Sequence, residues 1–306
     1  MKIVTTSPSF SKNITLQKEI YKYFPNAKLN LNGKRFNKDE LIDFIKDANG
    51  IIVGLEPIDS EVLDSCPNLK IISKYGVGLN NIDLDACKKR NIAIGWTGGV
   101  NRLSVAEMAL GFMLMFSRNL FITSNQLKKG TWNKSGGFEL SGKTIGIIGV
   151  GFIGKELNRL LKPFGCKILV NDIINQDEYY KKEGLIEVTK EEIFKKSDII
   201  TIHTPHNKTT DNMITLDVLK SMKPTSYILN TARGGIINEK DLKYALQNGI
   251  IAGAGIDAYI EEPPTDREFI ELPNLICTPH IGGNSKEAVE AMGMSAISHL
   301  KGFFNR

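Results

Sequence analysis

Two long blocks of alternating strand-like and helix-like segments dominate the sequence. The first block, residues 1–98, contains the β-branched runs "KIVTTS", "AKLNLN", "GIIVGL", "LKIISKYG" and "IAIGW". The second block, from residue 143, contains "TIGIIG", "CKILVND", "DIITIHT", "SYILNTA", "AGAGIDA" and "NLICTPH". Strands that alternate with helices form parallel sheets with crossover connections, so the pattern predicts an α/β protein with two parallel-sheet domains.

The end of the chain is a single helix-like segment, residues 284–306. One helix cannot form a domain, and 306 residues with 42% hydrophobic side chains are enough for two cores. We therefore expect the final helix to pack on the first block. This predicts a discontinuous domain of residues 1–98 plus 284–306 and a second domain of residues 99–283.

An apolar helix is predicted between the two blocks. Ser104 and Glu107 of "SVAE" have the spacing of a capping box, and the helix is expected to reach about Asn119. Its side chains are apolar almost all round, so the core or a second subunit must cover it.

Charge and cysteine usage exclude several classes of protein. The net charge of +5 comes from scattered Lys and Arg, without the basic blocks of a nucleic-acid tail. The four cysteines are far apart and lack metal-site spacing, which predicts free thiols and no metal. Neither a signal peptide nor an apolar run of about 18 residues is present. We expect a cytoplasmic protein with no membrane or nucleic-acid partner.

A dinucleotide-binding motif opens the second block. In "GIIGVGFIGKEL", Gly149, Gly151 and Gly154 match G-x-G-x-x-G directly after a strand and at the start of a helix. The first glycine permits a tight turn, the second permits close approach of a pyrophosphate, and the third permits close helix–strand packing. Phe152 and Ile153 would begin the helix, whose N-terminal amides attract an anion.

The next strand, "KILVND", ends at Asp172. An acid at this position hydrogen-bonds the adenosine ribose and would repel a 2′-phosphate. No arginine follows in "IINQDE", so NAD is favoured over NADP. A solvated turn residue is the alternative interpretation of Asp172.

Other polar residues follow the later strands of the same block. Ligands of open parallel sheets bind at the carboxyl ends of the strands. Arg233 in "NTARGG" could bind a carboxylate through two hydrogen bonds, or could form a structural ion pair. The predicted binding residues at these ends are His203, Thr204, Pro205, Thr231, Ala232, Arg233, Asp257, His280 and Gly282.

His280 in "TPHIGG" is the candidate for proton transfer. Glu261 and Glu262 in "IEEPP" lie after a neighbouring predicted strand, and a carboxylate beside His280 would fix its tautomer and favour its protonated form. A satisfied core histidine and a solvated acidic loop are the alternatives. His203, inside an apolar strand, is interpreted as structural, and His206 is expected in a loop over the pyrophosphate.

These motifs together make the chain similar to the D-isomer-specific 2-hydroxyacid dehydrogenases, and most like the short 3-phosphoglycerate dehydrogenases. The resemblance extends almost from end to end. It is carried by "KYGVGLNNID", "GVNRLSVAE", "GIIGVGFIGKEL", "HTPHNKTTDNMI", "NTARGGIINE", "GIDAYIEEPP" and "TPHIGGN".

The resemblance implies a Rossmann NAD-binding domain, a flavodoxin-like substrate domain and specific residue roles. Arg233 corresponds to the substrate-carboxylate arginine, His280 to the acid/base, and Glu262 to its partner. Asp257 corresponds to the contact with the nicotinamide carboxamide. The resemblance also implies a homodimer joined through the helix at 104–119.

The substrate loop of the family corresponds to residues 75–79. The residues predicted to bind substrate are Lys74, Tyr75, Gly76, Val77, Gly78, Arg102, Arg233 and His280. Many phosphoglycerate dehydrogenases carry an arginine where this chain has Gly54-Leu55-Glu56-Pro57. Lys74 and Arg102 could supply the missing positive charge, or could be exposed surface residues.

The predicted function is an NAD-dependent hydride transfer on a small D-2-hydroxy acid. The substrate expected first is 3-phospho-D-glycerate, oxidised to 3-phosphohydroxypyruvate as in serine biosynthesis, without feedback through an appended domain. A reductase for hydroxypyruvate, glyoxylate or another 2-oxo acid is the alternative with the same chemistry. An NAD-sensing binding protein like the corepressors of this fold is the alternative of another class.

Overall fold

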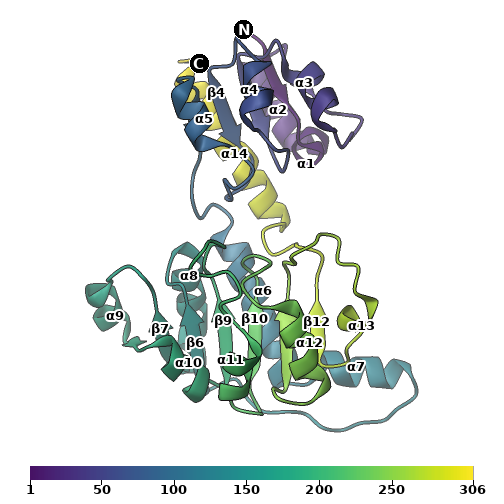
Figure 1. Ribbon diagram of the computed structural model, residues 1–306, viewed down its shortest axis with the longest axis vertical. Helices are drawn as coiled ribbons and strands as arrows, with labels where there is room; N and C mark the ends of the chain where they lie inside the picture. The colour runs from purple at the N-terminus through teal and green to yellow at the C-terminus, as the bar shows by residue number, and fades with distance from the viewer. Residues whose placement is uncertain (306) are drawn as a thin grey trace. The chain divides into compact units, whose positions relative to one another are not determined.

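The chain folds into two compact units. The structure, a computed structural model, describes residues 1–305. One unit comprises Met1–Asn101 and Asn284–Arg306, and the other comprises Arg102–Gly283 (Figure 1). The predicted boundary at 283/284 coincides with the observed one, and that at 98/99 falls in the segment Thr97–Asn101 just before it.

The first unit is built on a five-stranded parallel sheet. Its order is β2-β1-β3-β4-β5, which is the flavodoxin-like order predicted for this unit. The strands are β1 (Ile3–Thr5), β2 (Lys28–Leu29), β3 (Gly50–Val53), β4 (Ile71–Lys74) and β5 (Ala93–Gly95). The helices are α1 (Pro8–Lys12), α2 (Ile14–Tyr23), α3 (Lys38–Ile45), α4 (Ser60–Asp64), α5 (Leu84–Lys89) and the C-terminal α14 (Lys286–Phe303).

The C-terminal helix α14 completes the core of this first unit. In Figure 1 it is yellow and lies beside β4, among elements from the other end of the chain. Met292, Ile297 and Leu300 join the apolar cluster formed by α1, α2 and one face of the sheet. Ser73 of β4 also donates a hydrogen bond to the Ala296 carbonyl at 2.8 Å. Ser73 and Ala296 are 223 positions apart in the sequence, so this helix packs on elements from the other end of the chain.

The second unit is built on a seven-stranded parallel sheet. Its order, β12-β11-β10-β9-β6-β7-β8, is the doubly wound Rossmann order with one further strand, as predicted. The strand order reverses between β6 and β9, which are direct neighbours. The strands are β6 (Thr144–Ile148), β7 (Lys167–Asn171), β8 (Ile186–Glu187), β9 (Ile199–Ile202), β10 (Tyr227–Asn230), β11 (Gly253–Ile256) and β12 (Leu275–Cys277).

Helices cover both faces of this sheet. One face packs against α6 (Arg102–Ser117), α8 (Phe152–Leu161) and α9 (Asp177–Glu183). The other packs against α10 (Lys190–Lys196), α11 (Leu216–Ser221), α12 (Glu239–Gln247) and α13 (Arg267–Ile270). The remaining elements are α7 (Leu120–Lys128) and the 3-10 turn Lys162–Phe164.

The capping box predicted at Ser104 and Glu107 is wrong. A capping box does form at the start of α10, between Thr189 and Glu192. The helix α6 instead begins at Arg102, so Ser104 lies inside its first turn rather than before it. The Ser104 hydroxyl donates to the Gly282 carbonyl at 2.6 Å. A tertiary contact therefore uses the side chain that the local pattern assigned to capping.

The apolar helix α6 ends at Ser117, close to the predicted end at about Asn119. Asn119 has a left-handed backbone (φ 51°) and separates α6 from α7. Across residues 1–305 no single helix is long and apolar enough to span a membrane, and α6 with α7 meets the length and composition test only as a pair bent by 63°.

Candidate active site

The predicted site residues of the second unit follow strands of its parallel sheet, except for Arg102, which begins α6. The segments after β6, β9, β10, β11 and β12 carry Gly149, His203, Arg233, Asp257 and His280 respectively. Because the paired strands are parallel, their carboxyl ends lie on one edge of the sheet. That edge is the candidate active site.

The three motif glycines have different steric environments. Gly149 has φ +93°, and a Cβ there would lie 2.6 Å from the His203 carbonyl oxygen. A Cβ on Gly154 would lie 2.3 Å from the Gly149 carbonyl oxygen. A Cβ on Gly151, by contrast, would meet no atom within 4 Å. The first and third glycines therefore allow tight backbone packing, and the second borders open space at the start of α8, where a pyrophosphate would bind.

Asp172 connects the glycine loop to the turn after β7. Its Oδ2 accepts the Val150 amide at 2.6 Å, and its Oδ1 accepts the Ile174 amide at 2.9 Å. Each carboxylate oxygen has a second lone pair, so the side chain can still accept a ribose hydroxyl. Its negative charge at the motif opposes a 2′-phosphate.

Unsatisfied polar atoms identify where a polar ligand would fit on this edge. His203 Nδ1, Thr204 Oγ1 and Thr231 Oγ1 are buried and have no hydrogen-bond partner within the described chain. A buried polar atom without a partner costs about 1–3 kcal/mol. His203 Nε2 contacts the Thr201 hydroxyl at 2.9 Å, and burial lowers the pKa of His203 to about 3. These residues fit a large polar ligand such as a dinucleotide. His203 would contact that ligand as an uncharged imidazole.

Arg233 lies in a turn that Asn230 organises. The buried Asn230 side chain donates to the Arg233 carbonyl at 2.8 Å and accepts the Ala232 amide at 3.1 Å. Burial lowers the pKa of Arg233, and the charge of Glu262 opposes that shift. An arginine keeps its proton under such conditions, so the site presents a positive charge suited to a carboxylate. Sequence reasoning missed Asn230, although it directly precedes the "TARGG" segment.

Asp257 holds the turn that carries His280. Only 1% exposed, it accepts hydrogen bonds from the Thr278 hydroxyl at 2.6 Å, the Ile281 amide at 2.8 Å and the Gly282 amide at 2.7 Å. His280 itself has a left-handed backbone (φ 53°), which is costly for a residue other than glycine. The buried carboxylate therefore stabilises a strained turn, a role that the sequence did not reveal. Its contact with the cofactor stays a prediction.

His280 and Glu262 meet as a pair. His280 Nδ1 lies 2.8 Å and 2.9 Å from the two Glu262 carboxylate oxygens, and Glu262 Oε1 also accepts the Tyr259 amide at 3.1 Å. Both side chains are about two-fifths exposed, at 43% and 40%. With Nδ1 directed at the carboxylate, a proton exchange with a substrate would use Nε2.

In the first unit, the predicted substrate residues follow β4. Gly76, Val77 and Gly78 are partly exposed, and Gly76 has φ +131°. Lys74 is 5% exposed, so it is not the surface lysine considered as an alternative. Its ammonium group donates to the Gly54 carbonyl and to Asn81 Oδ1. Lys74 thus joins the ends of β3 and β4.

Two further substrate candidates also have protein partners. The Tyr75 hydroxyl lies 3.2 Å from the Ser9 hydroxyl. Arg102, in the second unit, donates from Nε to Glu156 at 3.2 Å, and the same carboxylate binds Arg159 at 2.6 Å. Lys74 and Arg102 therefore already interact with groups of the protein.

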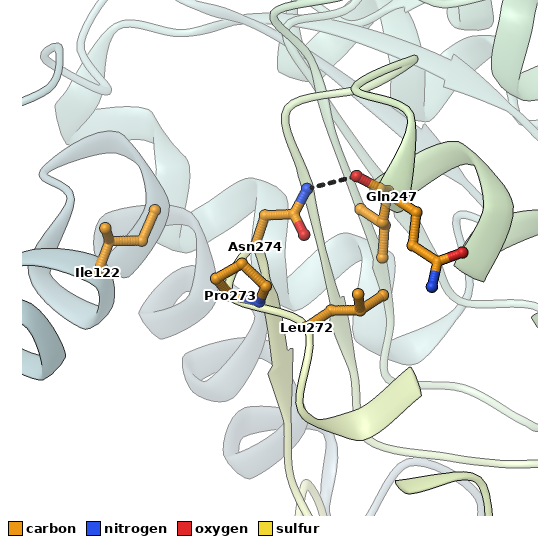
Figure 2. Close-up of a pocket in the computed structure, with 6 residues that line it drawn as sticks. Ile122, Gln247, Leu272, Pro273 and Asn274 are labelled. Carbon is orange, nitrogen blue, oxygen red and sulfur yellow. Dashed lines mark hydrogen bonds between the residues drawn. The ribbon is translucent and has the colours of Figure 1, made fainter. Parts of the chain in front are cut away.

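A separate pocket of about 470 Å³ lies at the other edge of the second unit's sheet (Figure 2). It is lined by Ile122, Leu246, Gln247, Leu272, Pro273 and Asn274. The Asn274 side chain donates a hydrogen bond to the Leu246 carbonyl at 3.1 Å. Asn274 precedes β12, whereas His280 follows it. The pocket therefore has no part in the His280 cluster.

Comparisons with known proteins match both the second unit by itself and most of the whole chain. A family model described as "D-isomer specific 2-hydroxyacid dehydrogenase, NAD binding domain" matches residues 110–282. The chain is 35% identical over 295 residues to a hydroxypyruvate reductase of Thermotoga maritima, covering 94% of this chain and 95% of that protein. It is 36% identical over 269 residues to a D-3-phosphoglycerate dehydrogenase of Methanocaldococcus jannaschii, covering 86% of this chain and 51% of that protein.

A solved structure gives a similar result. The D-lactate dehydrogenase of Aquifex aeolicus, complexed with NAD and lactic acid, matches with a TM-score of 0.85 and 27% identity. The match covers 100% of this chain and 96% of the other.

Gly151→Val should block the cofactor without disturbing the fold. The new side chain would enter open space from an extended backbone (φ −79°), where it would oppose a pyrophosphate. We expect NADH affinity, measured by fluorescence titration, to fall at least tenfold, while the unfolding temperature stays within about 2 °C. Gly136→Ala, also in open space, is the control. Unchanged NADH affinity in Gly151→Val would contradict this placement of the pyrophosphate.

His203 should make the protein less stable in acid. Its pKa is about 3 when folded and 6.5 when unfolded, so below pH 6.5 only the unfolded chain takes up the proton. The free energy of unfolding should therefore decrease as the pH is lowered from 6.5 to 4, by up to about 1.4 kcal/mol per pH unit. His203→Asn should flatten this slope in chemical denaturation, whereas His206→Asn, at a ring 41% exposed, should not. An equal slope in all three proteins would exclude the effect.

Proposed function

The chain belongs to the family of D-isomer-specific 2-hydroxyacid dehydrogenases, and we propose that it reduces a small 2-oxo acid without a phosphate group, of the hydroxypyruvate or glyoxylate type. The cofactor is NAD. The observation that carries the chemical assignment is the contact between His280 Nδ1 and Glu262 on the sheet edge that also carries the glycine motif. A proton-transfer pair beside a dinucleotide loop is the arrangement that hydride transfer needs.

Residues of the second unit would hold the cofactor. The open backbone at Gly151, the Asp172 carboxylate and the unsatisfied hydroxyls of Thr204 and Thr231 fit its polar groups. When bound, NAD supplies the hydride acceptor or, as NADH, the hydride donor. Neutral His203 would contribute an uncharged contact at the end of β9.

The chain's own residues perform the proton chemistry. In the reduction, His280 donates its Nε2 proton to the oxygen that gains charge at C2, and Arg233 stabilises that charge and binds the carboxylate. In the oxidation, His280 accepts the hydroxyl proton from the same oxygen. The Glu262 carboxylate, at 2.8 Å from Nδ1, stabilises the imidazolium in either direction. The Gly76–Gly78 amides of the first unit are our predicted second group of carboxylate ligands.

The choice of a substrate without phosphate rests on the cations that already have partners. Lys74 is buried against Gly54 and Asn81, and Arg102 is paired with Glu156. After β3, where many phosphoglycerate dehydrogenases have an arginine, Leu55 is 90% exposed. A phosphate would thus find an apolar side chain in place of a guanidinium.

The phosphoglycerate reaction expected from the sequence, and with it a place in serine biosynthesis, is the second candidate. Its support is the 36% identity to the Methanocaldococcus jannaschii enzyme, of which this chain spans about half. The Thermotoga maritima hydroxypyruvate reductase is matched over 95% of its length, which supports the first candidate.

Initial rates with a panel of acids test the proposal. We expect NADH oxidation with hydroxypyruvate or glyoxylate to exceed that with 3-phosphohydroxypyruvate at least tenfold in kcat/KM. His280→Ala should lower kcat about 100-fold or more because the proton donor is lost. Leu55→Arg should raise activity on the phosphorylated acid, with Leu55→Ala as control.

Two results would overturn this assignment. Preference for the phosphorylated acid would establish the second candidate. Tight NADH binding without turnover of any acid would favour the NAD-sensing binding protein considered from the sequence.

We further propose that two copies of the chain associate through α6 and α7. One side of α6 packs in the core, whereas four apolar side chains on its other side are only partly covered: Met108, Leu110, Leu114 and Met115. The helix α7 has no buried residue, and Leu120 and Leu127 are more than half exposed. Exposed apolar surface of this kind is typical of a subunit interface.

Sedimentation velocity should show a species of twice the chain mass of 34.0 kDa. Leu120→Asp with Leu127→Asp should shift it toward the monomer, because each charge would be buried in the interface. Ile14→Asp, at a residue 67% exposed in the first unit, is the matched control and should stay dimeric. A monomeric native protein would refute the association.

A further inference from the structure

The segment that carries Glu262 has few apolar anchors of its own. Tyr259 is buried, but Ile260 is 63% exposed and Glu261 and Glu262 are also exposed. Segments with little apolar burial open locally at low cost. Some other interaction must therefore keep Glu262 at hydrogen-bond distance from His280.

Glu239 supplies such an interaction from a different element. It is the first residue of α12 and is half-buried, and its Oε1 accepts the Ile260 amide at 2.7 Å. The preceding amide, that of Tyr259, donates to Glu262 at 3.1 Å. Two successive amides of this segment are thus bound by two different carboxylates.

Gly234 limits the same segment sterically. A Cβ on Gly234 would lie 1.9 Å from the Tyr259 carbonyl oxygen and 2.5 Å from the Ile260 nitrogen. The backbone next to Arg233 therefore packs directly on the backbone at 259–260. The segment is fixed by this contact and by the bond to Glu239.

A second attachment to α12 lies further along the segment. Lys243, one turn after Glu239, pairs with Asp266 and with Glu268, each at 2.9 Å. The helix α12 therefore holds the connection between β11 and α13 at two points, one on either side of Glu262.

The charge at Glu239 is electrostatically unfavourable where it lies. Burial raises the pKa of Glu239, and the charges of Asp266 and Glu262 raise it further, against the effect of the Ile260 amide. An acid placed beside two others does not optimise stability, and such costs are common at functional sites.

We propose that Glu239 is a positioning residue for the Glu262–His280 pair. Its hydrogen bond to Ile260 holds the segment 259–262 in the conformation in which Glu262 contacts His280 Nδ1. The expected effect on catalysis rests on the proposed function, whereas the effect of Glu239 on the contact between Glu262 and His280 does not depend on it.

Three variants test the hydrogen bond. Glu239→Ala removes the acceptor, and Glu239→Gln keeps an oxygen that can accept the Ile260 amide. Glu261→Ala is a matched control, since Glu261 is an exposed acid of the same segment that accepts a hydrogen bond from the Thr265 hydroxyl. We expect Glu239→Ala to lower kcat about tenfold or more, because small displacements of a catalytic group are costly. Glu239→Gln should recover kcat to within about threefold, and NADH affinity should be unchanged in all three.

A measurement independent of turnover separates failure of this inference from failure of the proposed function. In protein labelled with ¹⁵N-histidine, the His280 signal, assigned by its loss in His280→Ala, should show an Nδ1 proton shifted downfield by the Glu262 carboxylate. Glu239→Ala should abolish that shift, and Glu239→Gln should keep it. An unaltered His280 signal in Glu239→Ala, or equal loss of kcat in the Ala and Gln variants, would overturn the inference whether or not any acid is turned over.

Discussion

The parallel direction of all seven strands in the second unit is the constraint on which the site depends. Each strand ends on the same edge, so residues more than a hundred positions apart become neighbours. The glycine loop follows β6, and Glu262 and His280, the proposed proton-transfer pair, follow β11 and β12. Neither group could act in this chemistry without the other, because hydride transfer and proton transfer must occur on the same substrate.

The strand ends alone do not place the side chains. Polar residues behind them do so: Asn230 shapes the turn of Arg233, Asp257 holds the strained turn of His280, and Asp172 joins the glycine loop to β7. The side-chain oxygens of these three residues accept hydrogen bonds mostly from backbone amides. The site is therefore supported by hydrogen bonds between loops, which satisfy groups that would otherwise be buried without partners.

Much of this arrangement could be predicted from residue patterns. The two parallel sheets follow from the alternation of strands and helices, and their strand orders agree with the folds that the family resemblance implied. The glycine motif and His280 lie where strand ends were expected. The start of α6 was not predicted correctly, because a four-residue capping pattern cannot show that Ser104 bonds Gly282 across the fold. Lys74 was expected at the surface or on a phosphate, and its burial against Gly54 depends on how two loops meet.

The sequence by itself determined the class of fold, the family, the cofactor and the identity of the acid, base and arginine candidates, because periodicity and short motifs are local properties of a chain. Tertiary structure alone decided that His280 Nδ1 contacts Glu262, that Asp257 supports their turn, and that Glu239 binds the Ile260 amide. The physical reason is that hydrogen bonds form between groups brought together by packing. Residue spacing along the chain can place side chains at the same edge of a sheet, but it does not fix the distances between them.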